Sequence, residues 1–350
     1  MLRFLTKSAR PQPASRPPAG RRISVVIPSY NHAAYIAQAI GSVLDQESPV
    51  DELIIVDDSS TDASRAAIAR AIDGYAGPVR IHCDLLDRNG GAHAAIAHGL
   101  SRASGDVLTI LNSDDAYAPD RFRAIHAALP PDGDFIAFTG VDFMDASGAR
   151  LAEDDPVRVW YRDVLGQAGA CPTIGFALLR ANIAVTSGNL VFSRGLYERV
   201  GPFAAYRMCH DWDFLVRCMV HVEPIFVSGA LLQYRTHPTN TLKSTGDLMH
   251  GEGSAALKTY LALIAQGPTA NRLAPTPENW PVYFRFFTAT YAPWFTGQPI
   301  DTVARQLFPD PETLPSWLSA GPAAGGFLTA PAPEQDALAL RRVVDLLMPR

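Results

Sequence analysis

Between Ile23 and Pro119, short apolar runs alternate with longer stretches in which apolar residues recur at helical spacing. The four predicted strands are 23–27, 52–56, 79–83 and 106–111. The first two are continuous apolar runs, which are typical of strands that are buried on both faces of a sheet. The helical stretches between them are 33–44, 63–72 and 91–103, and Pro119 is suited to open a fourth helix. This order predicts an α/β, Rossmann-like fold with a mostly parallel sheet flanked by helices.

The regular alternation ends after Pro119. The segment 146–186 mixes Gly and Pro with other residues, and we predict an insertion or loop there. The remaining pattern predicts a strand in 134–143, a strand and helix in 187–201, an amphipathic helix in 211–220, late strands in 223–227 and 230–235, and helices from 246. We therefore expect a basic disordered tail (1–21), an α/β domain (22–245) and a helical C-terminal extension (246–350).

Composition narrows the classes of protein that the chain can represent. Of the 350 residues, 47% are hydrophobic, which suffices for a large core. The net charge of -5 gives no reason to expect a nucleic-acid partner. The four cysteines lack a C-x-x-C pair, which suits reduced thiols in a cytoplasmic protein better than disulfides or zinc. No apolar run approaches the roughly 18 residues that would span a bilayer.

The first 22 residues contain six basic residues and no acidic one. They lack the apolar core of a signal peptide, so secretion is not expected. One interpretation is a disordered tail rich in Pro and Ala. The alternative is a peripheral tether to the anionic inner face of a membrane, with Leu2, Phe4 and Leu5 entering the surface.

Acidic residues follow two of the predicted strands. The sequence "DDSSTD" (57–62) follows the second strand and "NSDD" (112–115) follows the fourth. The carboxyl ends of parallel strands meet at one edge of a sheet, where ligands bind in open α/β folds. Massed carboxylates repel one another unless a cation joins them, and Mg²⁺ or Mn²⁺ would suit. Both sequences also fit simple turns that are closed by Asx hydrogen bonds.

Asp211 begins the amphipathic helix of "CHDWDFLVR". It suits a helix N-cap, and it equally suits a general base at a helix end that borders a site. The first strand ends in "PSYN", which has no glycine, and the chain has neither G-x-G-x-x-G nor a P-loop. A G-x-S-x-G nucleophile elbow is also missing, so dinucleotide, P-loop and hydrolase functions lack their signatures.

Six motifs occur together in one order. They are "SVVIPSYNHAAYIAQAIGSVLDQ", "LIIVDDSSTDAS", "NGGAHAAIAHGL", "GDVLTILNSDDAYAPDR", "SGNLVFSRGLYERVGPF" and "HDWDFLVR". In order and spacing the region 22–240 resembles the family 2 glycosyltransferases, which are inverting enzymes of the GT-A fold. Ser113 replaces the first Asp of the family's D-x-D motif, and Ile96-Ala97 replaces the usual Arg-Asn. The Q-x-x-R-W motif of processive synthases is missing, so transfer of single sugars is expected.

The resemblance implies a role for each matching residue. Asp211 would deprotonate the acceptor hydroxyl. Asp115 would bind a divalent metal, Mn²⁺ or Mg²⁺, and His237 would complete that metal site. The nucleotide-sugar would be held by Pro28, Tyr30, Asn31, Asp58, Asn89, Gly91 and Asp114.

The resemblance also implies the substrates. The donor would be a nucleotide-sugar, by family usage a UDP-sugar, and the acceptor a glycan or lipid-linked molecule in cell-surface glycan synthesis. Two other functions stay open. A non-catalytic GT-A domain would bind nucleotide-sugars or partners without catalysis, but it would be expected to have lost one of the acids. A sugar nucleotidyltransferase would normally carry a glycine- and arginine-rich loop where this chain has "PSYN".

Overall fold

The structure is a computed structural model that describes residues 20–169, 171–238, 240, 246–281, 283–284 and 287. The predicted tail 1–21 lies outside the described residues except for its last two positions. In the predicted extension 246–350, all residues after Phe287 lie outside them as well. The domain boundaries proposed above therefore stay predictions.

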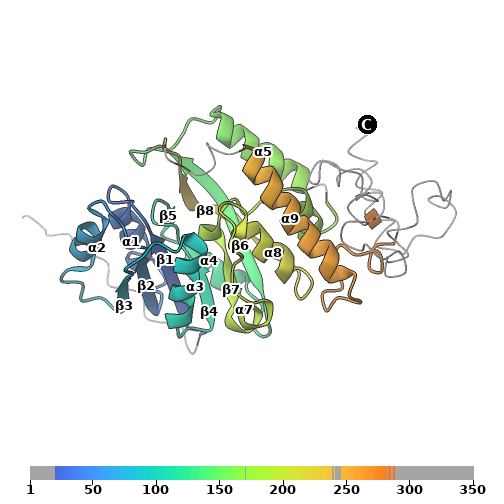
Figure 1. Ribbon diagram of the computed structural model, residues 1–350, viewed down its shortest axis with the longest axis horizontal. Coiled ribbons are helices and arrows are strands. Elements are labelled where there is room, and N and C mark those ends of the chain that lie inside the picture. The colour runs from blue at the N-terminus through green and yellow to red at the C-terminus, as the bar shows by residue number, and fades with distance from the viewer. Residues whose placement is uncertain are drawn as a thin grey trace, which may run out of the picture.

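One eight-stranded sheet forms the centre of the molecule, in the order β3-β2-β1-β4-β7-β6-β8-β5 (Figure 1). The strands are β1 (Ile23–Ser29), β2 (Glu52–Asp57), β3 (Arg80–Leu85), β4 (Val107–Ile110), β5 (Ala116–Tyr117), β6 (Ile136–Met144), β7 (Val191–Ser193) and β8 (Ile225–Arg235). The first four in sheet order pair in parallel, as the sequence predicted. The second half is mixed, because β7 runs antiparallel to both β4 and β6.

The two predicted late strands form a single strand, β8, which pairs in parallel with β6. The pairing changes register on both sides of Gly140, which pairs with Ala230. Gly229 has φ +108°, and a Cβ on Gly140 would lie 2.7 Å from the Gly229 carbonyl oxygen. Glycine at both positions lets the backbone kink while the strand continues, so the apparent break in the sequence pattern is an irregularity inside one strand.

Helices cover both faces of the sheet (Figure 1). The helices α1, α2, α4 and α5 contribute to the apolar core on one face, and α3, α6, α7, α8 and α9 to the core on the other. Their bounds are α1 (Ile36–Leu44), α2 (Ser64–Ile72), α3 (Ala92–Arg102), α4 (Arg121–Ala128), α5 (Pro156–Ala168), α6 (Ile174–Arg180), α7 (Arg194–Val200), α8 (His210–Cys218) and α9 (Gly246–Ile264). Successive residues of β1 contribute to opposite cores, because side chains alternate along a strand.

The segment 146–186, expected as an insertion or loop, contains the helices α5 and α6. The side chain of Asp155 caps α5 and that of Thr173 caps α6, each accepting a backbone N–H of the first turn. The residues from Gly175 to Leu179 are all buried, so α6 has no polar face. The sequence pattern missed it because a helix buried on all sides shows no amphipathic periodicity.

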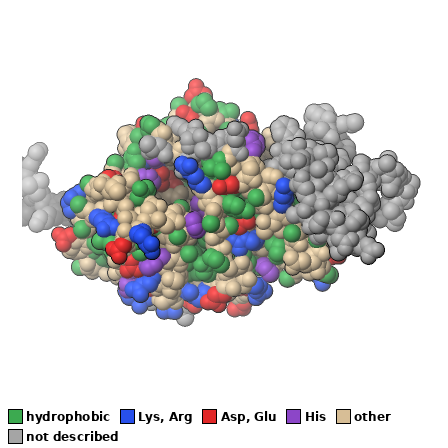
Figure 2. Space-filling model, in the orientation of Figure 1, with side chains coloured by type: hydrophobic (Ala, Val, Ile, Leu, Met, Phe, Trp, Pro, Cys, Tyr) green, Lys and Arg blue, Asp and Glu red, His purple; other side chains and the backbone are tan. Residues whose placement is uncertain are grey.

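Acidic and basic side chains are interspersed over the face of the molecule shown in Figure 2, in agreement with the small net charge of -5. Within the part of the chain that the structure describes, no helix combines the length and apolar character needed to cross a bilayer.

Replacing Gly99 by Ala is expected to destabilise the fold. A Cβ on Gly99 of α3 would lie 2.3 Å from Cγ1 of Val26 in β1, so helix and sheet would have to separate. Overpacking of this kind costs about 1–3 kcal/mol, and a lower Tm in thermal unfolding would show it. The matched control is Gly251→Ala in α9, where a Cβ meets nothing within 4 Å. That change should raise Tm slightly through helix propensity, and equal shifts for both variants would contradict the close contact.

Candidate functional site

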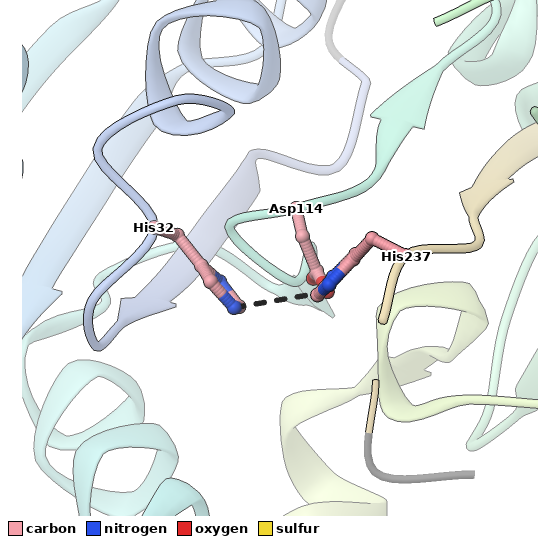
Figure 3. Close-up of side chains that lie close together, drawn as sticks. All are labelled: His32, Asp114 and His237. Carbon is pink, nitrogen blue, oxygen red and sulfur yellow. Dashed lines mark hydrogen bonds and ion pairs between the residues drawn. The ribbon is translucent and has the colours of Figure 1, made fainter. Parts of the chain in front are cut away.

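Three side chains converge beyond the strand ends: His32, Asp114 and His237 (Figure 3). His32 follows β1, Asp114 follows β4 and His237 follows β8. Nε2 of His237 lies 3.0 Å from Oδ2 of Asp114, and Nε2 of His32 lies 3.9 Å from the same oxygen. One potential ligand atom from each residue lies within 4.8 Å of the other two. The arrangement can hold one metal ion.

Neighbouring groups fix the orientation of this cluster. Nδ1 of His32 is hydrogen-bonded to the Ser113 hydroxyl at 2.8 Å, which leaves its Nε2 facing Asp114. The ring of Tyr35 lies 5.0 Å from that of His237, and the Arg235 guanidinium covers one face of the Tyr35 ring. Burial opposes ionisation of Asp114, but the hydrogen bond from His237 and the charges of the two histidines hold its pKa below the ordinary value. Asp114 is thus poised as an anionic ligand.

Asp115, which the sequence placed on the metal, faces the other way. Its Oδ1 accepts a hydrogen bond from the Arg235 backbone N–H at 2.9 Å, and its Oδ2 accepts one from Nδ2 of Asn112 at 3.2 Å. Burial raises its pKa well above the ordinary value, and the neighbouring charge of Asp114 adds to that rise. The side chain of Asp115 links the loop after β4 to β8. The carboxylate that lies beside the histidines is that of Asp114.

Asp58, Asn89 and Gly91, expected to contact the nucleotide, lie together. The two oxygens of Asp58 accept hydrogen bonds from the N–H groups of Gly90 and Gly91, each at 2.8 Å. Nδ2 of Asn89 donates to the Asp58 carbonyl oxygen at 3.2 Å. Gly91 has φ +86° and precedes α3, a conformation that favours glycine. The contacts bring the ends of β2 and β3 together, and a role for these residues in nucleotide binding stays a prediction.

The turn after β1 explains how "PSYN" manages without glycine. Asn31 adopts the left-handed conformation, with φ 55°, which Asn tolerates better than most residues. Its Oδ1 accepts hydrogen bonds from the N–H groups of Thr61 at 2.8 Å and Asp62 at 3.3 Å. Its side-chain oxygen therefore links two loops of the site. Tyr30 beside it is 44% exposed and available to a ligand, whereas Pro28 is half-buried within β1.

Asp211 lies in the first turn of α8 and is buried. Its Oδ2 accepts a hydrogen bond from Nδ2 of Asn182 at 3.0 Å, and its Oδ1 accepts one from the Trp212 N–H at 2.7 Å. It is not the N-cap of α8, because that position belongs to Cys209, whose side chain makes no capping bond. Burial raises the pKa of Asp211 above the ordinary carboxyl value, which suits a proton acceptor.

A pocket of about 560 Å³ has Asp211 in its wall. It lies among α5, α6, α8 and α9, four helices that meet on one side of the molecule (Figure 1). The lining residues are Trp160, Gln167, Arg180, Ala181, Asn182, Val185, Met208, Cys209, Asp211, Trp212, Met249, His250, Gly253 and Ser254. Apart from Asp211, none of these was singled out from the sequence as a site residue, because they come from helices and loops that only tertiary packing brings together.

The segment 182–188 connects the pocket with the loop after β4. Asn182 contacts Asp211, and Val185 lines the pocket. Farther along the segment, Thr186 accepts a hydrogen bond from Nδ2 of Asn112 at 2.6 Å. Val185 has φ 73°, which is rare for a β-branched residue and is a form of backbone strain that is often found at functional sites. No motif in the sequence indicated this connection.

Comparison with known proteins supports the class indicated by the fold. Residues 24–206 match the sequence profile described as "Glycosyl transferase family 2". The match covers more than half of the chain, which therefore belongs to glycosyl transferase family 2. The predicted family and class of enzyme, a glycosyltransferase, are confirmed.

Two curated relatives share part of the chain. The "Putative teichuronic acid biosynthesis glycosyltransferase TuaG" of Bacillus subtilis is 36% identical over 147 residues, 41% of this chain and 56% of that protein. The "Succinoglycan biosynthesis protein ExoO" of Rhizobium meliloti is 35% identical over 129 residues, 37% of this chain and 36% of that protein. The similarity thus spans about half of the first relative and about a third of the second.

Two solved structures share the fold at low sequence identity. The crystal structure of S. aureus TarS 1–349 in complex with UDP-GlcNAc has a TM-score of 0.55 and 13% identity, covering 85% of this chain and 83% of that one. The mannosyltransferase PcManGT from Pyrobaculum calidifontis, in complex with GDP-Man and Mn²⁺, has a TM-score of 0.51 and 17% identity, covering 98% and 84%. These likenesses confirm the predicted GT-A fold.

Proposed function

We propose that this protein is a metal-dependent, inverting glycosyltransferase that moves a single sugar from a nucleotide-sugar to an acceptor hydroxyl. The observation that carries the proposal is the convergence of His32, Asp114 and His237 beyond three strand ends of a GT-A sheet. Open α/β sheets bind their ligands at this position. Asp211, a buried carboxyl with a raised pKa in the wall of a pocket, supplies the expected base.

The donor atoms fit a divalent metal. Two imidazole nitrogens and one carboxylate suit Mn²⁺ better than Mg²⁺, which prefers oxygen ligands. To bind the ion, the Asp114 carboxyl must be ionised and both imidazoles must be neutral. When bound, the metal would neutralise charge on the diphosphate leaving group. The complex of PcManGT with Mn²⁺ is consistent with this choice.

We assign donor binding to the loops that surround the cluster. Tyr30 would offer its exposed ring to the base, with Pro28 and Asn31 shaping the turn. Asp58 would contact the base from β2, beside Asn89 and Gly91. A UDP-sugar is the preferred donor by family usage and by the UDP-GlcNAc complex of TarS. The GDP-Man complex of PcManGT makes a GDP-sugar the alternative to test.

Asp211 is assigned the proton transfer. Its carboxylate would accept the proton of the acceptor hydroxyl while the acceptor oxygen forms a bond to the anomeric carbon. The bond between that carbon and the diphosphate oxygen breaks as the new bond forms on the opposite face. The products are a glycoside of inverted configuration, a nucleoside diphosphate and a proton on Asp211.

The acceptor is proposed from the relatives. TuaG and ExoO are named for teichuronic acid and succinoglycan biosynthesis, so a glycan or lipid-linked intermediate of a cell-surface polysaccharide is the proposed acceptor. Such an enzyme would act in the cytoplasm, at the inner face of the membrane. The basic residues that would provide a membrane contact lie mostly in 1–19, outside the described residues.

The rate of transfer is expected to fall as the pH is lowered. The fall should begin at a higher pH than it would if the base were an aspartate with an ordinary pKa. Burial raises the pKa of Asp211, although His210 and the hydrogen bonds from Trp212 and Asn182 act in the opposite direction. The base must be ionised, so activity is lost as pH falls through the raised pKa. A profile of kcat/KM against pH measures this limb. An acidic limb at or below the ordinary value of 3.8 would contradict the assignment.

Nucleotide release from a panel of UDP- and GDP-sugars tests the proposal as a whole. Release is expected with Mn²⁺ and should be lost on adding EDTA, because the cluster would lose its ion. Calorimetry with UDP and GDP reports binding without turnover. Nucleotide binding without release for any donor and acceptor would favour the non-catalytic alternative. Neither binding nor release across the panel would refute the proposal.

A further inference from the structure

We propose that the pocket beside Asp211 holds an apolar group of the acceptor, so that the enzyme glycosylates a hydroxyl carried on an apolar body. The inference rests on the proposed role of Asp211 as the base and goes further by naming the chemical class of acceptor. A volume of about 560 Å³ is within the range of small-molecule sites. Because the pocket is lined by Asp211, the proposed general base, we assign it to the acceptor.

The mouth of the pocket exposes apolar surface. Trp160 of α5 is 44% exposed and Met249 of α9 is 40% exposed. They are two of only six large hydrophobic side chains that are exposed in the described part of the chain, and both line this one pocket. Apolar side chains that are scattered singly need no explanation, but apolar residues gathered at a pocket mark a binding site.

Trp212 presents apolar atoms to the pocket. Its indole Nε1–H donates to the Leu178 carbonyl oxygen at 2.7 Å, so the polar edge of the ring is used within the fold. A Cβ on Gly253 would lie 2.8 Å from Cζ3 of Trp212, so glycine at this position lets α9 approach the ring closely. The indole is therefore fixed in the pocket wall.

The wall places apolar surface next to the proposed base, which favours an acceptor that carries an apolar group close to its reacting hydroxyl. Asp211 and Asn182 are hydrogen-bonded to each other on one wall. Around them, Trp160, Val185, Trp212 and Met249 supply the apolar surface of the wall, and Gln167, Arg180, His250 and Ser254 add polar groups. An aryl or alkyl group would cover the exposed apolar side chains of this wall, and its removal from water favours binding.

Two glycosides that differ only in their apolar group test the proposal. Calorimetry compares p-nitrophenyl β-D-glucopyranoside with methyl β-D-glucopyranoside, each titrated into the protein with Mn²⁺ and UDP. The aryl compound is expected to bind at least about tenfold more tightly, because its ring is removed from water. Met249→Asp and Trp160→Ala should each remove most of that preference. Leu273→Asp, at a residue that is 45% exposed and outside the pocket, is the matched control and should retain it.

Equal affinity for the two glycosides would overturn the proposal and indicate a sugar subsite. An aryl preference that persists in both pocket variants would also overturn it, because the ring would then bind elsewhere. Binding of UDP with Mn²⁺ is measured separately on the same protein. Loss of that binding would count against the proposed glycosyltransferase function, so the two failures are distinguishable.

Discussion

Asp211→Asn is expected to slow sugar transfer by about 10²- to 10⁴-fold, the usual contribution of a general base. The amide cannot accept the proton of the acceptor hydroxyl, so the nucleophile stays protonated. Nucleotide binding should be unchanged, because the predicted donor-binding residues lie at the end of β1, in the loops after β1, β2 and β4, and before α3, not on α8. Single-turnover transfer and nucleotide calorimetry on the same preparation separate the two effects.

The same substitution should leave the fold intact. Burial disfavours the ionised form of Asp211, so a neutral side chain of the same shape removes an unfavourable charge. Asn182 Oδ1 has no hydrogen-bond partner among the described residues, so a flip of the Asn182 amide can accept a hydrogen bond from the new amide. Tm should therefore match or exceed that of the unsubstituted protein. Transfer within tenfold of the original rate, in a folded variant, would place the base elsewhere.

Asp114→Asn is expected to weaken Mn²⁺-dependent nucleotide binding at least about 100-fold. Loss of an outer-shell partner typically costs 10- to 100-fold in metal affinity, and loss of a charged ligand costs no less. The paired variant is Asp115→Asn, whose remaining oxygen can still accept the Arg235 N–H. This substitution replaces a buried carboxyl group whose pKa is raised. The Mn²⁺-dependent affinity for the nucleotide should stay within a few-fold of that of the unsubstituted protein.

The pair of variants decides between two assignments of the metal ligand. The resemblance implies Asp115 as the metal ligand, whereas in the structure Asp114 lies beside His32 and His237 and Asp115 accepts a hydrogen bond from the Arg235 N–H. Calorimetry of UDP binding with Mn²⁺ and with EDTA gives the metal-dependent part of the affinity for each variant. If Asp115→Asn lost that part and Asp114→Asn kept it, the assignment from the motif would be right and the structural cluster would be incidental.

The parallel half of the sheet followed directly from the sequence. The runs that became β1, β2 and β4 are continuous and apolar because each strand is covered by helices on both faces. Their order along the chain, with helices between them, restricts the topology to a few arrangements. The edge position of the acidic loops then follows from the parallel direction of the strands. The family could be identified for the same reason, because its motifs lie at these strand ends.

Side-chain direction, by contrast, could not be deduced from the sequence. Asp114 and Asp115 are adjacent and chemically identical, and only the path of the loop turns one to the histidines and the other to β8. His32 was passed over because its partners lie far along the chain and a lone histidine in a turn carries no metal signature.

The sequence by itself determined the α/β core, the order of the strand ends and the glycosyltransferase class. Those properties depend on local periodicity and on motifs within short segments. The tertiary structure alone decided which carboxylate lies beside His32 and His237, that Asn182 donates a hydrogen bond to Asp211, and that four helices contribute to the wall of a pocket beside Asp211. These contacts join residues far apart in the chain, and their geometry depends on how whole helices and strands pack rather than on any local pattern.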